Sequence, residues 1–132
     1  DYYASRGLGD VYKRQGFYDA YYKKAKLVQK RIMQEFASQF ADVDVIATPT
    51  VPSTAFKIGE NTDDPLKMYA NDVCTVTVNI AGLPAISIPC AYDDKGLPVG
   101  MQLIGGKFTE QRLLNTAYAY EQLVGGFKMP EL

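Results

Sequence analysis

The sequence contains no histidine and no tryptophan among its 132 residues. The absence of histidine removes the commonest general base and the commonest metal ligand, and with them every Ser-His-Asp or Cys-His catalytic arrangement. Cysteine is scarce as well, because Cys74 and Cys90 are the only two, and they lie far apart in apolar surroundings without a CxxC spacing. We therefore expect no metal site, and we expect both thiols to be buried in the reducing environment of the cytoplasm.

An excess of charge of either sign is also lacking. Lys and Arg number 14 and Asp and Glu number 15, which gives a net charge of -1. No overall positive field is therefore available to hold nucleic acid, and any RNA contact must be local or made by a partner. No apolar run approaches the 18 or so residues that a membrane-spanning helix needs, so we expect no contact with a membrane. The 47% of apolar and 22% of charged residues are typical of one globular domain.

The hydrophobic pattern predicts the order helix, strand, helix, hairpin, helix. A long amphipathic helix is expected over 16–41, where apolar residues recur at spacings of three and four. Its lysine-rich face is most simply a solvated surface, although it could also bind RNA or a protein. A strand is expected over 43–48, ending there because Pro49 and Pro52 lack amide donors, and an ordered loop should follow over 49–64.

The segment 65–82 is compatible with two structures. Asp64 can accept amide hydrogens as an N-cap, Pro65 suits the first helical position, and Gly82 can end a helix. The alternation of β-branched and polar residues over 74–80 would also fit a strand. We favour the helix because the cap and the stop bracket one continuous element.

The last third of the chain predicts a hairpin and a helix. Strands are expected over 85–92 and 99–104 around a turn at 93–96. Thr109 can cap a final helix that Gly125 ends. Strands with helices between them indicate the α/β class, here a mixed sheet flanked by helices. With about three strands, much of the sheet edge would be open.

A nucleophile beside a base is not recognisable in this sequence. Ser87 lies between two isoleucines and is more simply explained as a hydrogen-bonded serine of a strand. The acid pairs Asp63-Asp64 and Asp93-Asp94 are typical of helix caps and Asx-turns rather than of a glycosidase. The sequence therefore offers no catalytic residue that stands out by itself.

Asp72 is the best binding candidate. It is a lone acid among apolar neighbours in the expected helix, so its carboxylate could lie at the edge of a pocket and bind an ammonium group. The alternative is an exposed acid paired with a lysine, which would contribute little to stability. The binding interpretation requires a cavity beside the carboxylate.

Four blocks of the sequence resemble the C-terminal part of amidase signature enzymes. They are DVDVIATPT at 42–50, DDPLKMY at 63–69, NIAGLPAISIPC at 79–90 and GLPVGMQLIG at 96–105. The NxxGxPAxSxP pattern is typical of the whole family, whereas DDPLKMY points to its tRNA-dependent, glutamine-hydrolysing branch. The resemblance runs in order over roughly residues 16 to 124.

This resemblance implies hydrolysis of the side-chain amide of glutamine by a serine that is activated through a second serine and a lysine. The ammonia would pass to another amidotransferase subunit, which uses ATP and magnesium to amidate glutamate carried by tRNA(Gln). The three catalytic residues belong to a Gly-Ser-rich region upstream in the family, so we expect none of them, and no bound cofactor, in this fragment. The aspartate that binds the α-ammonium group of glutamine in the family corresponds to Asp72. The alternative is a fragment of another amidase signature hydrolase that acts on a small amide.

The resemblance also divides the chain. Residues 1–7 look like the family, but 8–15 do not match it and resemble translated adapter sequence. We therefore expect 1–15 to be a family-like start followed by a non-native junction, and 16–132 to be the C-terminal portion of an amidase signature domain. For this reason Arg14 is not assigned the role of the carboxylate-binding arginine of the family.

Overall fold

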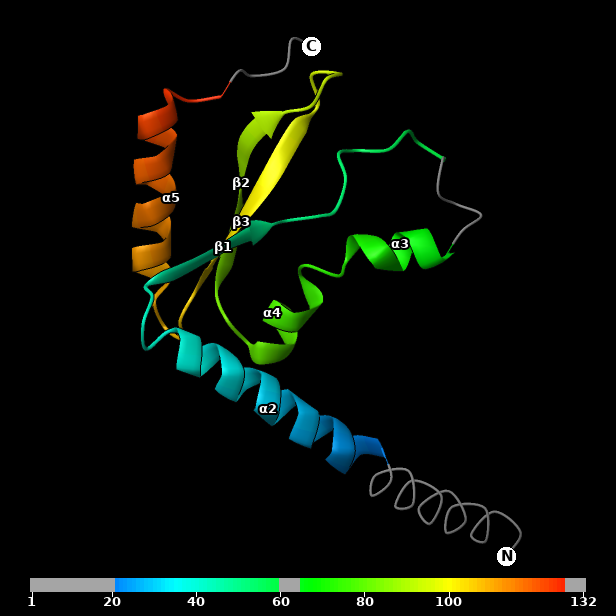
Figure 1. Ribbon diagram of the computed structural model, residues 1–132, viewed down its shortest axis with the longest axis vertical. Helices are drawn as coiled ribbons and strands as arrows, with labels where there is room; N and C mark the ends of the chain where they lie inside the picture. Colours follow the sequence, from blue (N-terminus) through cyan, green and yellow to red (C-terminus); the bar gives the residue numbers. More distant parts are fainter. Residues whose placement is uncertain (1–20, 60–64, 128–132) are drawn as a thin grey trace, which may run out of the picture.

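The computed structural model describes residues 21–59 and 65–127, in which seven elements follow one another (Figure 1). In chain order they are α2 (Lys23–Gln39), β1 (Val45–Pro49), α3 (Pro65–Asn71), α4 (Val76–Ala81), β2 (Ala85–Tyr92), β3 (Pro98–Gly105) and α5 (Glu110–Val124). The predicted order is confirmed, except that the third helix is two helices. The expected junction at 8–15 and the expected cap at Asp64 lie outside the described residues.

The three strands form one sheet in the order β1-β3-β2, and both pairings are antiparallel. The expected hairpin of β2 and β3 is confirmed, and β1 pairs with the other side of β3. Gln102 on the central strand therefore has Thr48 and Ser87 as its two neighbours across the sheet. The α/β class is confirmed, and within the described residues β1 and β2 are edge strands.

The predicted end of the first strand is wrong by one residue. Pro49 belongs to β1 and lies opposite Met101 of β3. A proline removes one backbone donor, which excludes it from a central strand but not from an edge strand whose outer side pairs with nothing. The open edge of the sheet is therefore what allows Pro49 to continue the strand.

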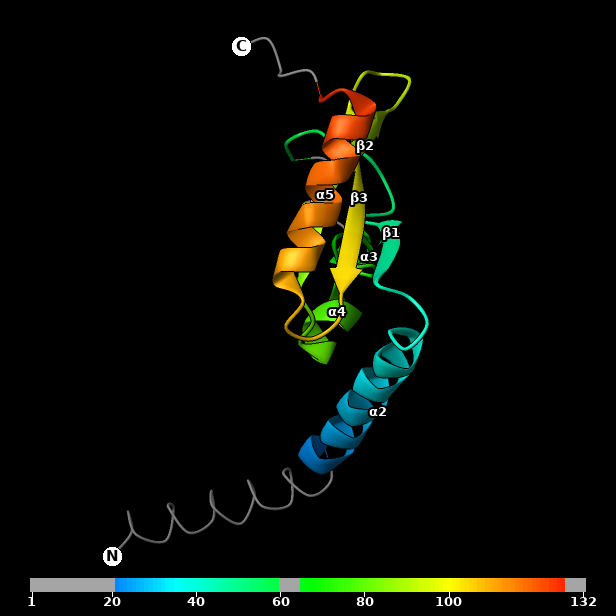
Figure 2. The same ribbon diagram turned by 90° about the vertical axis from the view of Figure 1, so that its left-hand side faces the viewer.

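The two faces of the sheet are covered differently. Leu103, Leu113 and Ala117 form the buried apolar cluster between β3 and α5, with Val45, Ile86, Ile88 and Met101 packed around it. Figure 2 shows α5 in front of the sheet, and in both views α3 and α4 lie on the other side. Because successive side chains of a strand point to opposite faces, the alternation of Leu103 and Gln102 assigns the apolar face to α5 and a polar face to the side of α4.

The helix predicted over 65–82 is interrupted at 72–75. The backbone N–H of Thr75 donates to the Asp72 carbonyl at 3.0 Å, and the Thr75 hydroxyl donates to the same oxygen at 3.2 Å. Such tight turns and hydroxyl bonds compete with a regular helix, and the β-branched Val73 and Val76 weaken it further. The strand alternative over 74–80 is wrong, whereas the predicted stop at Gly82 is confirmed by its left-handed backbone, with φ 67°.

The final helix ends as predicted but starts differently. Gly125 has φ 77° and ends α5. Thr109 occupies the N-cap position, yet its hydroxyl donates to the Gly106 carbonyl at 2.8 Å and makes no cap bond to α5. The expectation that its side chain caps the helix is therefore wrong, because the preceding turn uses the hydroxyl as a donor.

Helix α2 extends away from the sheet and packs against α4 (Figure 1). None of its residues is buried. Gln29 connects the two helices, because its Nε2 atom donates to the Ile80 carbonyl at 2.8 Å. Among the described helices, none combines the length and apolar character needed to cross a bilayer.

Candidate functional site

Asp72, the predicted binding residue, lies at the break between α3 and α4. Its N–H donates to the Tyr69 carbonyl at 3.2 Å, and its own carbonyl accepts from Thr75 and Val76 at 3.0 Å each. These bonds fix the backbone on both sides of the residue. Asp72 is exposed, and its carboxylate has no hydrogen bond or ion pair to any residue that the structure describes.

A polar face of the sheet lies behind this break. Gln102 is 4% exposed, and its Nε2 atom donates to the Thr48 hydroxyl and to the Cys74 carbonyl, both at 3.1 Å. The bond to Cys74 joins the central strand β3 to a residue two positions after Asp72. The sheet therefore holds the break between the two helices directly, through one side chain.

Ser87 and Thr50 form a pair of hydroxyl groups on the same face, with their oxygens 2.7 Å apart. Gly100 lies beneath them, and a Cβ atom there would meet the Thr50 hydroxyl at 3.0 Å and the Ser87 hydroxyl at 3.2 Å. Among the described residues no amine or carboxylate contacts either hydroxyl. The interpretation of Ser87 as a hydrogen-bonded strand serine is confirmed, and its environment gives no means of activating it as a nucleophile.

Asp93 forms the Asx-turn that the acid pair predicted. Its Oδ1 atom accepts from the N–H groups of Leu97 at 2.8 Å and Lys95 at 2.9 Å, and its Oδ2 atom accepts from the Thr54 hydroxyl at 2.8 Å. The bonds from Leu97 and Thr54 are the main causes that lower the pKa of the Asp93 carboxyl below its ordinary value. This carboxylate joins the loop after β1 to the hairpin, and both of its oxygens accept hydrogen bonds in that connection.

Both cysteines are free thiols and are half-buried rather than buried. The expectation of burial is wrong because each lies at the margin of the packed region, Cys74 in the helix break and Cys90 on an edge strand. The Cys90 thiol donates to the Val99 carbonyl at 3.5 Å. In 21–59 and 65–127, acidic and thiol side chains do not gather into a set that could hold a metal ion.

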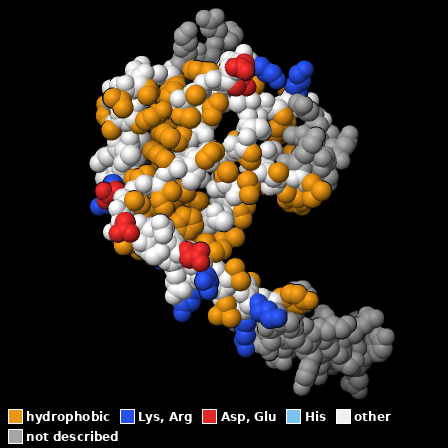
Figure 3. All heavy atoms as spheres, in the orientation of Figure 1, with side chains coloured by type: hydrophobic (Ala, Val, Ile, Leu, Met, Phe, Trp, Pro, Cys, Tyr) orange, Lys and Arg blue, Asp and Glu red, His pale blue; other side chains and the backbone are white. Residues whose placement is uncertain are grey.

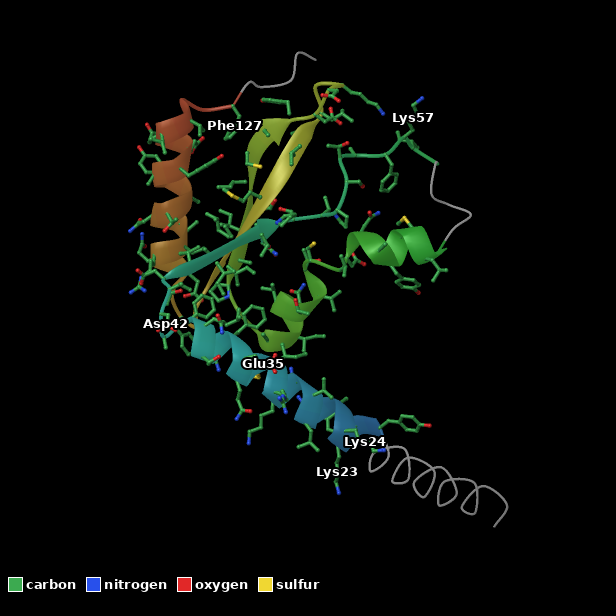
Figure 4. The ribbon with its side chains drawn as sticks, viewed as in Figure 1. Lys23, Lys24, Glu35, Asp42, Lys57 and Phe127 are labelled. Carbon is green, nitrogen blue, oxygen red and sulfur yellow. The ribbon has the colours of Figure 1, made fainter. Side chains whose placement is uncertain are left out.

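Two apolar pockets lie away from Asp72. One of about 270 Å³ is formed between β2 and α5, and Phe127 lines it at the end of α5 (Figure 4). The other, of about 480 Å³, lies between α2, β1 and α4 beside Glu35, which Figure 4 also labels. Asp72 lines neither pocket. Neither of these pockets is therefore the cavity that the binding interpretation requires, and the assignment of Asp72 stays a prediction about a more complete protein.

The lysine-rich helix α2 carries mixed charges in the structure. Arg31 and Glu35 form an exposed ion pair at 3.2 Å, and Lys26 donates to Gln29 at 2.9 Å. Exposed pairs of this kind contribute little to stability. Lys23 and Lys24 come from the first turn of α2, at the end of the helix that lies far from the sheet (Figure 4). Binding of RNA or protein by this helix stays a prediction.

Gln102 was not identified as a functional residue from the sequence. A signal was available, since a glutamine stands between Met101 and Leu103 in an otherwise apolar strand, and a buried amide needs partners. The partner itself was not predictable, because Cys74 is 28 positions away and the break that exposes its carbonyl was not expected.

Comparison with known proteins gives one family. Residues 4–114 match the sequence model of the family described as Amidase. The chain is 54% identical over 96% of its length to the A subunit of glutamyl-tRNA(Gln) amidotransferase from Brevibacillus brevis, and 56% identical over 89% of its length to the protein of the same name from Synechococcus elongatus. It spans about 28% and 27% of the length of these two relatives.

Solved structures agree with these relatives. The A subunit of glutamyl-tRNA(Gln) amidotransferase from Thermotoga maritima matches 97% of this chain with a TM-score of 0.80 and 39% identity, and the match covers 29% of that structure. Allophanate hydrolase of Kluyveromyces lactis matches 74% of this chain with a TM-score of 0.63 and 30% identity, over 16% of its own chain. The fold is thus shared with enzymes of different names, whereas sequence identity is higher to the amidotransferase subunits.

Proposed function

The chain belongs to the amidase family, and from this premise we propose that it forms the C-terminal portion of the glutamine-hydrolysing subunit of a glutamyl-tRNA(Gln) amidotransferase. The observation that carries the proposal is the identity of 54% to the Brevibacillus brevis subunit over nearly the whole chain. Identity to the allophanate hydrolase is 30%, so the alternative of another amide hydrolase has less support.

The proposed reaction uses water to break the amide C–N bond of glutamine, which leaves glutamate and releases ammonia. The serine nucleophile would come from the part of the subunit that this chain does not span, as would the second serine and the lysine through which it is activated. The ammonia would then be used by a partner subunit with ATP and magnesium to amidate glutamate on tRNA(Gln). By itself this chain would be inactive, and its place would be the cytoplasm, where tRNA is charged.

Within this reaction Asp72 would bind the α-ammonium group of glutamine. Two observations support the role: the backbone around Asp72 is fixed by hydrogen bonds, and no described residue pairs with the carboxylate. A charge-assisted bond from a carboxylate to an ammonium group contributes about 1.5 to 3 kcal/mol. The missing part of the subunit would supply the other walls of the cavity.

The test is Asp72→Asn in the full-length subunit, assembled with its partner subunits. Loss of the carboxylate charge should lower glutamine-driven amidation of Glu-tRNA(Gln) by roughly 10- to 100-fold. Amidation driven by added ammonium chloride should not change, since ammonia bypasses the glutamine site. The measurement is the rate of Gln-tRNA(Gln) formation with each nitrogen donor.

Asp94→Asn is the matched control, because Asp94 is an exposed acid in the hairpin turn, away from α3 and α4. It should leave both rates unchanged. Equal loss with both nitrogen donors in Asp72→Asn would reject the assignment of Asp72. An assembled complex that hydrolyses small amides without any dependence on tRNA or ATP would instead support the alternative hydrolase.

A further inference from the structure

Gln102 is a buried polar side chain in the middle of the central strand. The proposed reaction assigns it no role. It is 4% exposed, although its neighbours Leu103 and Ile104 are apolar and about as deeply buried. A buried amide without partners would destabilise the protein, so its position is tolerated only because its hydrogen bonds are made.

Both hydrogens of the Gln102 Nε2 atom have an acceptor. One is the Thr48 hydroxyl on the neighbouring strand, and the other is the Cys74 carbonyl, each at 3.1 Å. Thr48 holds the amide in one orientation, and the amide in turn holds the Cys74 carbonyl. The two bonds therefore connect β1, β3 and the break between α3 and α4 in a single row.

This row is a direct polar link between the sheet and the segment that carries Asp72. The segment 72–75 is bounded by two short helices of 7 and 6 residues. Isolated helices of that length are unstable in water, so they do not fix the segment by themselves. A tertiary anchor is needed, and Gln102 supplies it from a strand that is paired on both sides.

We propose that Gln102 is a positioning residue for glutamine: it holds the segment 72–75 against the sheet and thereby fixes the Asp72 carboxylate where the ammonium group binds. This inference rests on the proposed function of Asp72. A carboxylate that is already held in place binds without a further loss of conformational entropy, whereas a carboxylate on a loose segment must first be ordered.

The test is Gln102→Met in the full-length subunit within its complex. Methionine has a similar length and shape but donates no hydrogen bond, so the Cys74 carbonyl loses its partner. The KM for glutamine should rise by about tenfold, while the rate with ammonium chloride as the nitrogen donor stays unchanged. Combined with Asp72→Asn, the substitution should add little, because the group that it positions is already gone.

Leu113→Ala separates positioning from general destabilisation. Leu113 is 3% exposed on the opposite face of the sheet, so its truncation weakens the packing of α5 without touching the segment 72–75. It should leave the KM for glutamine unchanged. An equal rise of KM in Leu113→Ala and Gln102→Met would overturn the inference, since the effect would then be one of stability alone.

Thr48→Val provides a second route if Gln102→Met does not fold. The variant removes the acceptor that orients the Gln102 amide, so the amide holds the Cys74 carbonyl less firmly and amide hydrogen exchange at 72–76 should become faster in the assembled complex. Unchanged exchange there would overturn the inference. If Asp72→Asn raises KM and Gln102→Met does not, the inference fails while the proposed function stands. If the wild-type complex shows no glutamine-driven amidation of Glu-tRNA(Gln), the proposed function itself fails.

Discussion

The Asp93 carboxylate accepts hydrogen bonds from Leu97, Thr54 and Lys95, which lower its pKa. In the unfolded chain these bonds are absent, so the unfolded pKa is the higher one, at about 3.9. A group of this kind stabilises the fold above its unfolded pKa, and the stabilisation is lost as the pH falls through the folded pKa. The turn between β2 and β3 should therefore weaken only in strongly acidic solution.

The prediction concerns the folded pKa of Asp93 itself. A carbon-13 NMR titration of its carboxyl group should give a value below the ordinary one, and Thr54→Val should move it upward because one of the three donors is lost. Thr50→Val, a matched change at a hydroxyl that pairs with Ser87 instead, should have no such effect. Titration of Asp93 at or above its ordinary pKa would contradict the assignment of these bonds.

Single residues were predictable where their function in the fold is local. The Asx-turn at Asp93 follows from residues two and four positions away, and the hydrogen-bonded Ser87 follows from its strand. Gln102 was not predictable, since its partner is set by how two distant segments pack. The role of Asp72 stays a prediction, because it requires a cavity beside the carboxylate and Asp72 lines neither of the two pockets described above.

At the scale of elements, the end of α4 depends on a backbone that only glycine adopts easily. Gly82 has φ 67°, and its N–H donates to the Asn79 carbonyl at 3.1 Å. We predict that Gly82→Ala destabilises the fold by about 1 to 2 kcal/mol, because a Cβ atom disfavours this conformation. Gly82→Asn should cost less, since asparagine tolerates it better.

The measurement for Gly82 is the free energy of unfolding from urea denaturation of the full-length subunit. Open space surrounds the position where a Cβ atom would lie, so a steric clash is not the cause of the expected loss. Equal stability of Gly82→Ala and the unchanged protein would show that α4 can end without this conformation.

Element types were more predictable than element boundaries. Periodicity identified α2, α5 and the hairpin because each has one apolar stripe or one alternating face. The prediction of one helix over 65–82 was wrong at its centre, where Thr75 and the β-branched residues around it form turns that a continuous helix would exclude. The predicted end of β1 before Pro49 was wrong because proline is excluded from central strands only. The sequence did not show that β1 is an edge strand.

At the scale of the whole molecule, much apolar surface is left exposed. Figure 3 shows hydrophobic side chains spread over the face that carries the sheet and α3. Leu123 is 84%, Val73 63% and Tyr69 73% exposed, while six apolar side chains in the described residues form the buried core. Apolar surface on this scale is typical of an interface.

We predict that the isolated chain binds a hydrophobic dye strongly and self-associates, because these side chains have nothing to pack against. Dye fluorescence and size-exclusion chromatography measure both properties. Addition of the separately produced remainder of the subunit should reduce them, whereas an unrelated protein at the same concentration should not. A monomeric chain that does not increase the fluorescence of the dye would argue against an incomplete domain.

The general architecture of the molecule could be predicted because layers follow from the pattern of apolar residues. Which face of the sheet meets α5 and which meets α4 could not, since both faces of β3 carry residues that can be buried. The fold alone also does not separate the amidotransferase subunits from other enzymes, because the allophanate hydrolase matches with a TM-score of 0.63.

The alternation of Leu103 and Gln102 along β3 has a consequence for insertions. One extra residue placed before this pair would turn every later side chain of the strand over. The leucine would then face the gap between the two short helices, and the amide would lie among hydrocarbon groups beneath α5. A change that adds no charge and removes no atom would thus remove both the apolar layer beneath α5 and the hydrogen bond from Gln102 to the Cys74 carbonyl. The spacing of this strand should therefore tolerate substitution far better than a shift in length.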